Sequence, residues 1–198
     1  NILCNQKLLI QIKLESNLLT NICSCVFKNL TNLNYLDLSD NFLSANSFDI
    51  FNLNKLEKLR LAKNRLESVE KSLFTNLTSL KSLDLSDNYY LKDFQADINN
   101  LNTFYFNNNS KVRNFNLNSN NLLELNARNV SDYVIRKILT DSNFTNINNL
   151  DISFNKIDLK LLINTDFYLN TENLYLQNTE IDLYNYIFSN LTKLKRID

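Results

Sequence analysis

The residues that could do chemistry in this chain are few, and most of them are carboxylates. Aspartates recur directly after an apolar residue, at Asp37, Asp84, Asp151 and Asp198, and paired carboxylates can serve as general acid and base. The chain has no histidine, so Ser-His and Cys-His dyads and histidine metal ligands are excluded. It also has no glycine for a phosphate-cradling loop. We therefore expect no enzyme, no catalytic residue, no metal site and no cofactor.

Three cysteines, Cys4, Cys23 and Cys25, lie close together near the amino-terminal end. Three thiols without a histidine do not supply the four ligands of a structural zinc site. Their clustering favours a disulfide that holds an exposed terminal coil, with one cysteine left over. Free buried thiols are the alternative, and the spacing does not decide which two cysteines would pair.

Six Asn-x-Ser/Thr sequons could accept N-linked glycans in a secreted protein. So many sequons are close to what chance gives in a chain this rich in asparagine, so their positions say more than their number. Three of them belong to a recurring Phe-x-Asn-Leu-Thr sequence, and we predict that at least one sequon is glycosylated if the protein is secreted. The six are Asn29, Asn76, Asn108, Asn129, Asn143 and Asn190.

A repeated pattern of leucine and asparagine must position all of these residues. The stretch Leu30–Leu43 contains Leu33-x-x-Leu36-x-Leu38-x-x-Asn41-x-Leu43, and the asparagine returns at near-constant spacing as far as Asn109. Leucines at this spacing cannot be buried by one strand and turn, so coils must stack to form a core. The pattern predicts an α/β-type solenoid, a leucine-rich repeat horseshoe. Its parallel β-sheet lines the concave face, with loops or short helical turns on the convex face.

We expect one array over residues 1–198, with about eight repeats and an irregular zone at 110–146, as a fragment of a longer chain. In that zone Leu123-x-Leu125-x-x-Arg128 fits a degenerate repeat, unevenly spaced between the flanking asparagines. Phe115-x-Leu117-x-x-Asn120 also matches, but its asparagine follows Asn109 too closely to leave room for one coil. Tyr133–Leu139 is expected to form a short convex helix.

Two sets of residues should have structural roles. The motif asparagines are expected to form a buried ladder, because their amides can satisfy backbone groups where the chain turns. Phenylalanines of the returning segments should fill the space behind the sheet. The ladder comprises Asn17, Asn41, Asn64, Asn88, Asn109 and Asn155, with Thr179 in the next such position. The phenylalanines are Phe27, Phe51, Phe74, Phe144 and Phe188.

The residue between the two strand leucines of each motif faces outward, because side chains alternate along a strand. Neighbouring coils lie ~4.8 Å apart, so opposite charges in this position on successive coils attract each other. An ordinary solvated face is one interpretation of this row, and a concave binding surface is the alternative. The row is Lys13, Asp37, Arg60, Asp84, Tyr105, Glu124, Asp151 and Tyr175, followed by Asp198.

Composition limits the classes of partner. Basic and acidic residues number 21 each, so no electrostatic footprint points to nucleic acid or to anionic lipid. No apolar run reaches the ~18 residues of a membrane span, and no signal peptide is visible. Leu and Asn each occur 38 times, while Gly, Pro, His, Met and Trp are absent. A coding bias towards A and T explains the missing Gly, Pro and Trp better than the missing Met and His.

Three segments resemble a known class of repeat: VFKNLTNLNYLDLSDN, LFTNLTSLKSLDLSDN and IFSNLTKLKRID. They are similar to the Phe-containing leucine-rich repeat of ~24 residues, which is typical of Toll-type receptor ectodomains and secreted insect immune proteins. The shortened step into FYFNNN is similar to the mid-array irregularity of mosquito leucine-rich immune proteins. The resemblance implies an extracellular or cell-surface protein of the secretory pathway. The cysteine-rich caps and the coiled coil of those relatives are not seen in this chain.

Three hypotheses of function follow. The first is an extracellular, non-catalytic recognition module of innate-immune or receptor type. It would bind a protein or microbial-surface ligand through its concave face or flanks, as a monomer or a homo- or hetero-dimer. The second is a cell-adhesion or developmental receptor ectodomain. The third is an intracellular scaffold, for example cytoskeletal, with reduced cysteines and unused sequons.

Overall fold

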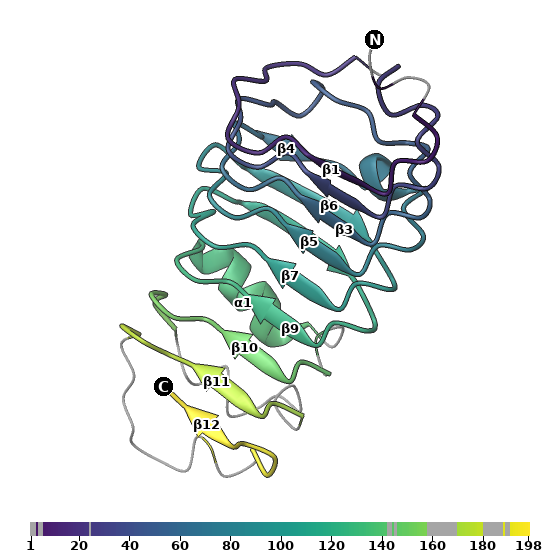
Figure 1. Ribbon diagram of the computed structural model, residues 1–198. Helices are drawn as coiled ribbons and strands as arrows, with labels where there is room; N and C mark the ends of the chain where they lie inside the picture. Colours follow the sequence, from purple (N-terminus) through teal and green to yellow (C-terminus); the bar gives the residue numbers. More distant parts are fainter. Residues whose placement is uncertain are drawn as a thin grey trace.

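The computed structural model of the protein describes residues 3, 6–23, 25–141, 144, 146–157, 170–179, 188 and 191–198. The chain winds into a solenoid, and its short strands lie side by side from the amino-terminal to the carboxy-terminal end (Figure 1). This is the horseshoe architecture that the leucine spacing predicts. No helix within the described ranges is long and apolar enough to cross a membrane.

One sheet of nine strands forms the inner wall of the solenoid, and every pairing in it is parallel. Each coil contributes one short strand, in the order β1-β2-β3-β5-β7-β9-β10-β11-β12. The strands are β1 (Gln11–Lys13), β2 (Tyr35–Asp37), β3 (Lys58–Arg60), β5 (Ser82–Asp84), β7 (Thr103–Tyr105), β9 (Glu124–Asn126), β10 (Asn149–Asp151), β11 (Asn173–Tyr175) and β12 (Arg196–Ile197).

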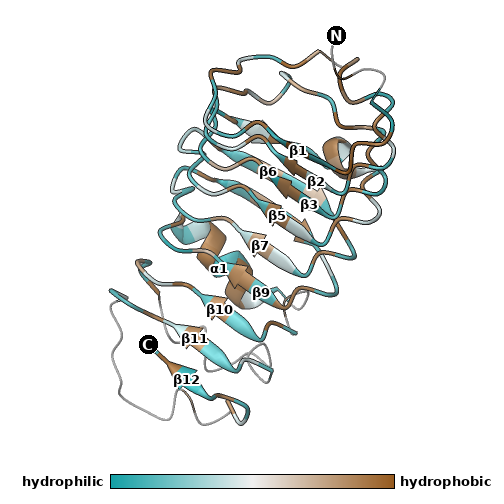
Figure 2. Cartoon of the chain, in the orientation of Figure 1, coloured by the Kyte–Doolittle hydropathy of each residue, from teal (hydrophilic) through white to brown (hydrophobic). Residues whose placement is uncertain are grey.

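The central residue of these strands points into the solenoid and is buried, as Leu36, Leu59 and Leu83 show with no exposed area. The two flanking residues point outward, so hydrophilic and hydrophobic residues succeed each other within each short strand (Figure 2). Parallel sheets are normally covered on both faces. Here one face carries half-buried polar and aromatic side chains that no other described segment covers, and it is open to a partner.

The convex side is not made of loops and helical turns alone, because it contains a second parallel sheet. Its strands are β4 (Ser68–Val69), β6 (Asp93–Asp97) and β8 (Asn114–Asn118), in that order. Phe115 and Leu117 are buried in β8, which explains why this stretch matches half a motif although no coil starts there. Sequence periodicity alone did not distinguish a buried convex strand from a buried concave one.

Two helical segments complete the convex side, the 3-10 helix η1 (Lys71–Phe74) and the helix α1 (Asp132–Thr140). α1 is the helix expected at Tyr133–Leu139. It begins where Ser131 accepts a hydrogen bond from the Val134 backbone N–H. The negative charge of Asp132 in the first turn interacts favourably with the positive end of the helix dipole. Its apolar side buries Val134, Ile135, Ile138 and Leu139.

Phe27, Phe74 and Phe144 are buried behind the inner sheet as expected, and Phe188 is half-buried. The expectation for Phe51 was wrong, because its side chain is 52% exposed. Ile50 is fully buried in its place, and its carbonyl accepts from Leu53 as that of Phe27 accepts from Leu30. Both Ile50 and Phe51 fit the apolar position in the sequence pattern. The backbone register of the folded coil places Ile50, and not Phe51, in the core.

Candidate functional site

The predicted concave row exists as a set of paired positions on neighbouring strands, with one error. Lys13, Asp37, Arg60, Asp84 and Tyr105 are successive register partners on β1, β2, β3, β5 and β7. The next partner is Asn126, followed by Asp151 and Tyr175. Glu124 is therefore not in this row.

The error arose in the irregular zone, where the first strand leucine is Leu125 and not Leu123. Leu123 is 42% exposed, whereas Leu122 and Leu125 are each 1% exposed. Leu125 pairs with Phe104 on one side and Leu150 on the other. Leu125 is thus the first strand leucine of this coil and Leu122 the buried leucine before it, so the motif lies two residues later than expected.

Val130, and not Arg128, occupies the asparagine position of this coil. The Val130 backbone N–H donates to Asn155 Oδ1 at 2.9 Å, as that of Asn88 donates to Asn109 Oδ1 at 3.1 Å. The expectation that Arg128 replaces the asparagine, with the uneven spacing that it implied, was wrong. Val130 carries no polar side chain that could have marked the position in the sequence.

Glu124 still lies on the concave face, in the parallel row that contains Tyr35, Lys58, Ser82 and Thr103. The Tyr105 Oη donates a hydrogen bond to Glu124 Oε1 at 2.8 Å. Burial raises the pKa of Tyr105, and this hydrogen bond and the carboxylate charge raise it further, to about 12. Tyr105 is therefore a neutral donor at neutral pH, and its ring is held in place.

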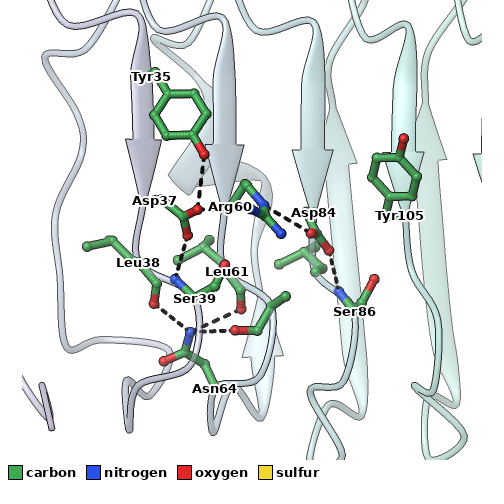
Figure 3. Close-up of polar contacts among 12 residues, drawn as sticks. Tyr35, Asp37, Leu38, Ser39, Arg60, Leu61, Asn64, Asp84, Ser86 and Tyr105 are labelled. Atoms are coloured by element: carbon green, nitrogen blue, oxygen red, sulfur yellow. Dashed lines mark hydrogen bonds and ion pairs between the residues drawn. The ribbon is translucent and has the colours of Figure 1, made fainter. Parts of the chain in front are cut away.

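Arg60 lies between two carboxylates at the centre of the row (Figure 3). Its Nη1 is 3.1 Å from Asp37 Oδ2, and its Nε is 3.4 Å from Asp84 Oδ2. The side chain of Arg60 is 40% exposed, against 3% for Asp37 and 13% for Asp84. Burial alone would lower the pKa of Arg60, but the two carboxylates raise it. The two carboxylates thus hold the guanidinium in place, and its other side is exposed to solvent.

Asp37 is almost fully bonded within the protein. Its Oδ1 accepts from the Ser39 backbone N–H at 3.0 Å, and its Oδ2 accepts from Tyr35 Oη at 3.0 Å (Figure 3). Burial by itself would raise the pKa of Asp37, but these hydrogen bonds and the Arg60 charge lower it below its usual range. A general acid or base needs a pKa near the working pH. Asp37 therefore positions Arg60 and Tyr35 and is unsuited to proton transfer.

Cations lie over the aromatic rings of this face. Lys13 and Lys58 Nζ are each 5.8 Å from the ring centre of Tyr35, which lies on β2 between their strands. Burial raises the pKa of Tyr35. The neighbouring Arg60 lowers this pKa, whereas the hydrogen bond to Asp37 raises it. Tyr35 and Lys58 were not expected in the site, because the predicted row comprised only one of the two outward positions of each strand. Taking both positions would have found them.

The other end of the row is arranged differently. Asp151 accepts from the Ser153 backbone N–H at 3.1 Å and lies 3.7 Å from Arg128 Nε. Tyr175 is covered by the Arg196 guanidinium, 5.3 Å from its ring centre. These residues share the row with Arg60 but lie on later coils. The contacts described above do not link them to the Arg60 cluster, by which we mean Arg60 with Asp37 and Asp84.

The motif asparagines connect successive coils below the strands. Asn64 Nδ2 donates to the carbonyls of Leu61 and Ala62 in its own coil and to that of Leu38 in the preceding coil (Figure 3). Its Oδ1 accepts from the Leu43 backbone N–H at 3.0 Å. The amides of Asn41, Asn88, Asn109 and Asn155 also bridge to the preceding coil.

Three positions of this series differ. Asn17 is exposed, and its amide donates within its own coil, to Leu14 and Glu15. Val130 has no amide to offer, so the series is interrupted between Asn109 and Asn155. Thr179 donates through Oγ1 to the Leu176 carbonyl at 2.6 Å.

The cysteines and sequon asparagines that the structure describes lie outside the strands of the inner sheet. Cys23 is exposed, and its sulfur accepts from the Cys25 backbone N–H at 3.4 Å. Cys4 lies outside the described residues, so the disulfide stays a prediction. Asn29 and Asn76 are half-buried on convex turns. Asn108 and Asn129 follow strands β7 and β9 and are bonded to each other. Asn143 and Asn190 lie outside the described residues.

The stacked coils form a parallel-strand solenoid with the horseshoe fold of leucine-rich repeats. Residues 54–97 match the model of the family described as Leucine rich repeat, and none of the curated proteins matches the chain in sequence.

Three solved structures are similar to the chain. Human 5T4 (Wnt-activated inhibitory factor 1, trophoblast glycoprotein) has a TM-score of 0.72 and 20% identity, over 95% of this chain and 76% of that one. The leucine-rich repeat domain of APL1B has a TM-score of 0.53 and 19% identity, over 93% and 53%. The LRIM1/APL1C complex has a TM-score of 0.56 and 20% identity, over 96% and 35%. At these identities the likeness shows the shared fold alone.

Proposed function

We propose that the chain is a non-catalytic recognition module that works outside the cell and binds a protein partner through its concave face. The central contact surface is the concave cluster, defined as Tyr35, Lys58, Arg60, Tyr105 and Glu124. The observation that supports it is the presentation of Arg60 by one buried and one partly buried carboxylate, Asp37 and Asp84, on an open parallel sheet.

The side chains of the concave cluster are of the types that dominate protein interfaces. Tyrosine and arginine are enriched among the residues that contribute most to binding. Here their rotamers are already fixed by hydrogen bonds, so little conformational entropy is lost when a partner binds. The surface also carries both charge signs, which suits a protein partner of complementary pattern better than a polyanion.

The extracellular part of the proposal has separate support. Asn29 and Asn76 lie on convex turns, where a glycan would leave the concave face clear. Among proteins of similar fold, 5T4 is named a glycoprotein, and LRIM1 and APL1C form a complex with each other. An innate-immune or other cell-surface role is the finer form of this proposal.

A photo-crosslinking amino acid at position 58 tests the binding surface directly. We expect it to capture a discrete partner, whereas the same amino acid at exposed Thr75 on the convex side should not. With the captured partner, Arg60→Glu and Tyr105→Ala should weaken binding by about 10- to 100-fold without lowering the melting temperature enough to unfold the chain. Equal capture from both faces, or unchanged affinity of both variants, would contradict the proposal.

Mass measurement of native material under non-reducing conditions tests the extracellular part. A disulfide, or a glycan on at least one sequon, is expected. Three free thiols and no glycan would instead favour the intracellular scaffold, whatever the outcome of the crosslinking.

A further inference from the structure

A hollow of about 620 Å³ lies at the rim of the solenoid, after the carboxyl ends of β7, β9, β10 and β11. Its volume is in the range of small-ligand sites, ~300–1,000 Å³. Tyr105 and Glu124 of the concave cluster lie on β7 and β9 themselves, whereas the residues that line the hollow follow the strands, and none of them belongs to the cluster. Its lining consists of Asn107, Asn108, Arg128, Asn129, Phe154 and Asn178.

Phe154 is an unusual residue for its backbone conformation. One residue of each coil turns with positive φ, and Phe154 has φ of 61°. Bulky side chains are disfavoured there, whereas Asn and Asp are several-fold enriched. Phe154 is also 42% exposed, so its ring adds little to the core. A strained and exposed aromatic ring is the kind of outlier that points to function. The other residues in this position are Ser16, Asp40, Lys63, Asp87, Asn108, Asn129 and Asn178.

Arg128 is placed beside this ring. Its guanidinium carbon is 5.0 Å from the ring centre of Phe154, and its Nε is 3.7 Å from Asp151 Oδ2. The side chain is 41% exposed. The ring and the carboxylate orient the guanidinium, whose two terminal nitrogens can still meet a carboxylate in the paired geometry that arginine favours.

Side-chain amides line the rest of the hollow. The Asn129 Nδ2 donates to Asn108 Oδ1 at 3.0 Å, and the Asn108 Nδ2 donates to Asp87 Oδ1 at 2.7 Å. Asn107 differs, because its Oδ1 is buried and no described residue donates a hydrogen bond to it. A buried acceptor left without a donor is costly, and the residue that carries it lines the hollow.

The backbone at the hollow is already paired. The N–H groups of Asn108, Asn129 and Phe154 donate to carbonyls of the following coils at 2.9, 3.2 and 2.7 Å. An extended peptide binds largely through free backbone groups of a sheet edge. Recognition here must run through side chains, which favours a compact ligand that carries its own hydroxyl groups.

We propose that this rim hollow binds an acidic sugar, a hexuronic acid residue of a polysaccharide. The apolar face of the sugar ring packs on Phe154, its hydroxyls bond to the amides of Asn107 and Asn129, and its carboxylate pairs with Arg128. The site is independent of the protein-binding surface proposed above.

Isothermal titration of the full chain with a galacturonic acid tetrasaccharide tests the site, with the carboxyl-reduced tetrasaccharide as the neutral comparison. We expect the acidic sugar to bind at least tenfold more tightly than the neutral one. Arg128→Gln should remove this preference. No binding by the unmodified chain at millimolar sugar, or equal affinity for both sugars, would overturn the proposal.

Phe154→Asn separates a binding role from a structural one. Asn suits the positive φ, so the variant should melt at the same or a higher temperature and yet lose at least tenfold in affinity. Phe42→Asn is the matched control. Phe42 is also exposed, with the Arg65 guanidinium 4.4 Å from its ring centre, but it lies on another coil and outside the positive-φ position. Phe42→Asn should leave binding unchanged, and equal losses in both variants would refute the site.

Discussion

Two stretches of the solenoid solve the same stacking problem in different ways. The coils from β2 to β5 are long, with register partners at Tyr35, Lys58 and Ser82, and a motif asparagine in every coil bonds to the coil before it. The coils from β5 to β9 are shorter, with the partners Ser82, Thr103 and Glu124, and the series of asparagines is interrupted at Val130. In this second stretch the convex side is formed by the strands β6 and β8.

The convex segment accounts for the difference in length. An extended strand advances about 3.3 Å per residue and a 3-10 helix about 2.0 Å, so a strand crosses the back of the coil with fewer residues. The coils that hold β6 and β8 are the short ones. The coil of η1 runs from Lys58 to its partner Ser82, and that of α1 runs from Glu124 to Asn149, so both are longer. The length of a repeat therefore indicates whether its convex segment forms a strand or a helix.

The core of the second stretch is aromatic. The Phe94 ring lies 5.2 to 5.4 Å from the rings of Phe104, Phe106 and Phe115. Large side chains fill the space between the two sheets, where the first stretch uses leucine. We infer that aromatic packing there offsets the hydrogen bonds lost at Val130.

Phe94→Ala should have the largest effect of the changes that break this comparison. The ring is fully buried and touches three others, so we expect a loss of about 3–5 kcal/mol in the free energy of unfolding. Because coils contact only their neighbours, hydrogen exchange should show the loss first in β6 to β8 and last in β2 and β3. Uniform loss of protection along the chain would show that the stretches unfold as one unit.

Asn64→Leu tests the first stretch in the same way. The change leaves the Leu43 N–H without its acceptor and removes one of the two amide donors to the Leu38 carbonyl, and we expect a destabilisation of roughly 1–3 kcal/mol by thermal or denaturant unfolding. Asn17→Leu is the control, because Asn17 is exposed and bonds within its own coil. Its effect should stay within about 0.5 kcal/mol. Equal melting curves for Asn64→Leu and the unmodified chain would contradict the ladder.

The contrast also shows what sequence reasoning could reach. In the first stretch the strand leucines and the ladder were predictable to the residue, since Leu36, Leu59 and Leu83 and their asparagines share one spacing, whereas the buried convex residue was misplaced by one, at Phe51 in place of Ile50. The second stretch was misread by two residues at the coil of β9, because Leu123 and Leu125 have the spacing of the two strand leucines and Val130 carries no asparagine mark. The same limit hid the second sheet, where Phe115 and Leu117 have the alternation of any strand. Neither Arg128 beside Phe154 nor Tyr35 between two lysines follows from spacing, because these contacts depend on side-chain direction between coils.

The pH dependence of stability is the third test, and it concerns the Arg60 cluster of the first stretch. The folded pKa of Asp37 is lowered, so its stabilisation is fully present above the unfolded value, about 3.9, and is lost as pH falls through the folded value. The stability difference between the unmodified chain and Asp37→Asn should therefore be larger at pH 7 than at pH 3. Thermal melts of both proteins at the two pH values measure it, and a constant difference would remove Asp37 as the anchor of Arg60.

The smallest effect should come from the position that both stretches share. Each coil turns at one residue with positive φ, and Lys63 holds it in the first stretch with φ of 54°. Lys63 is exposed, and Asp40 and Asp87 occupy the same position in the adjoining coils. Asn tolerates this conformation better than Lys, so Lys63→Asn should stabilise the fold by about 0.5–1 kcal/mol in denaturant unfolding. Both stretches form this turn without a single glycine. A stabilising effect would mean that the stacking of the coils imposes the positive φ on Lys63, and that the preference of the lysine itself opposes it. A destabilising effect would instead assign Lys63 a contact that its exposure does not suggest.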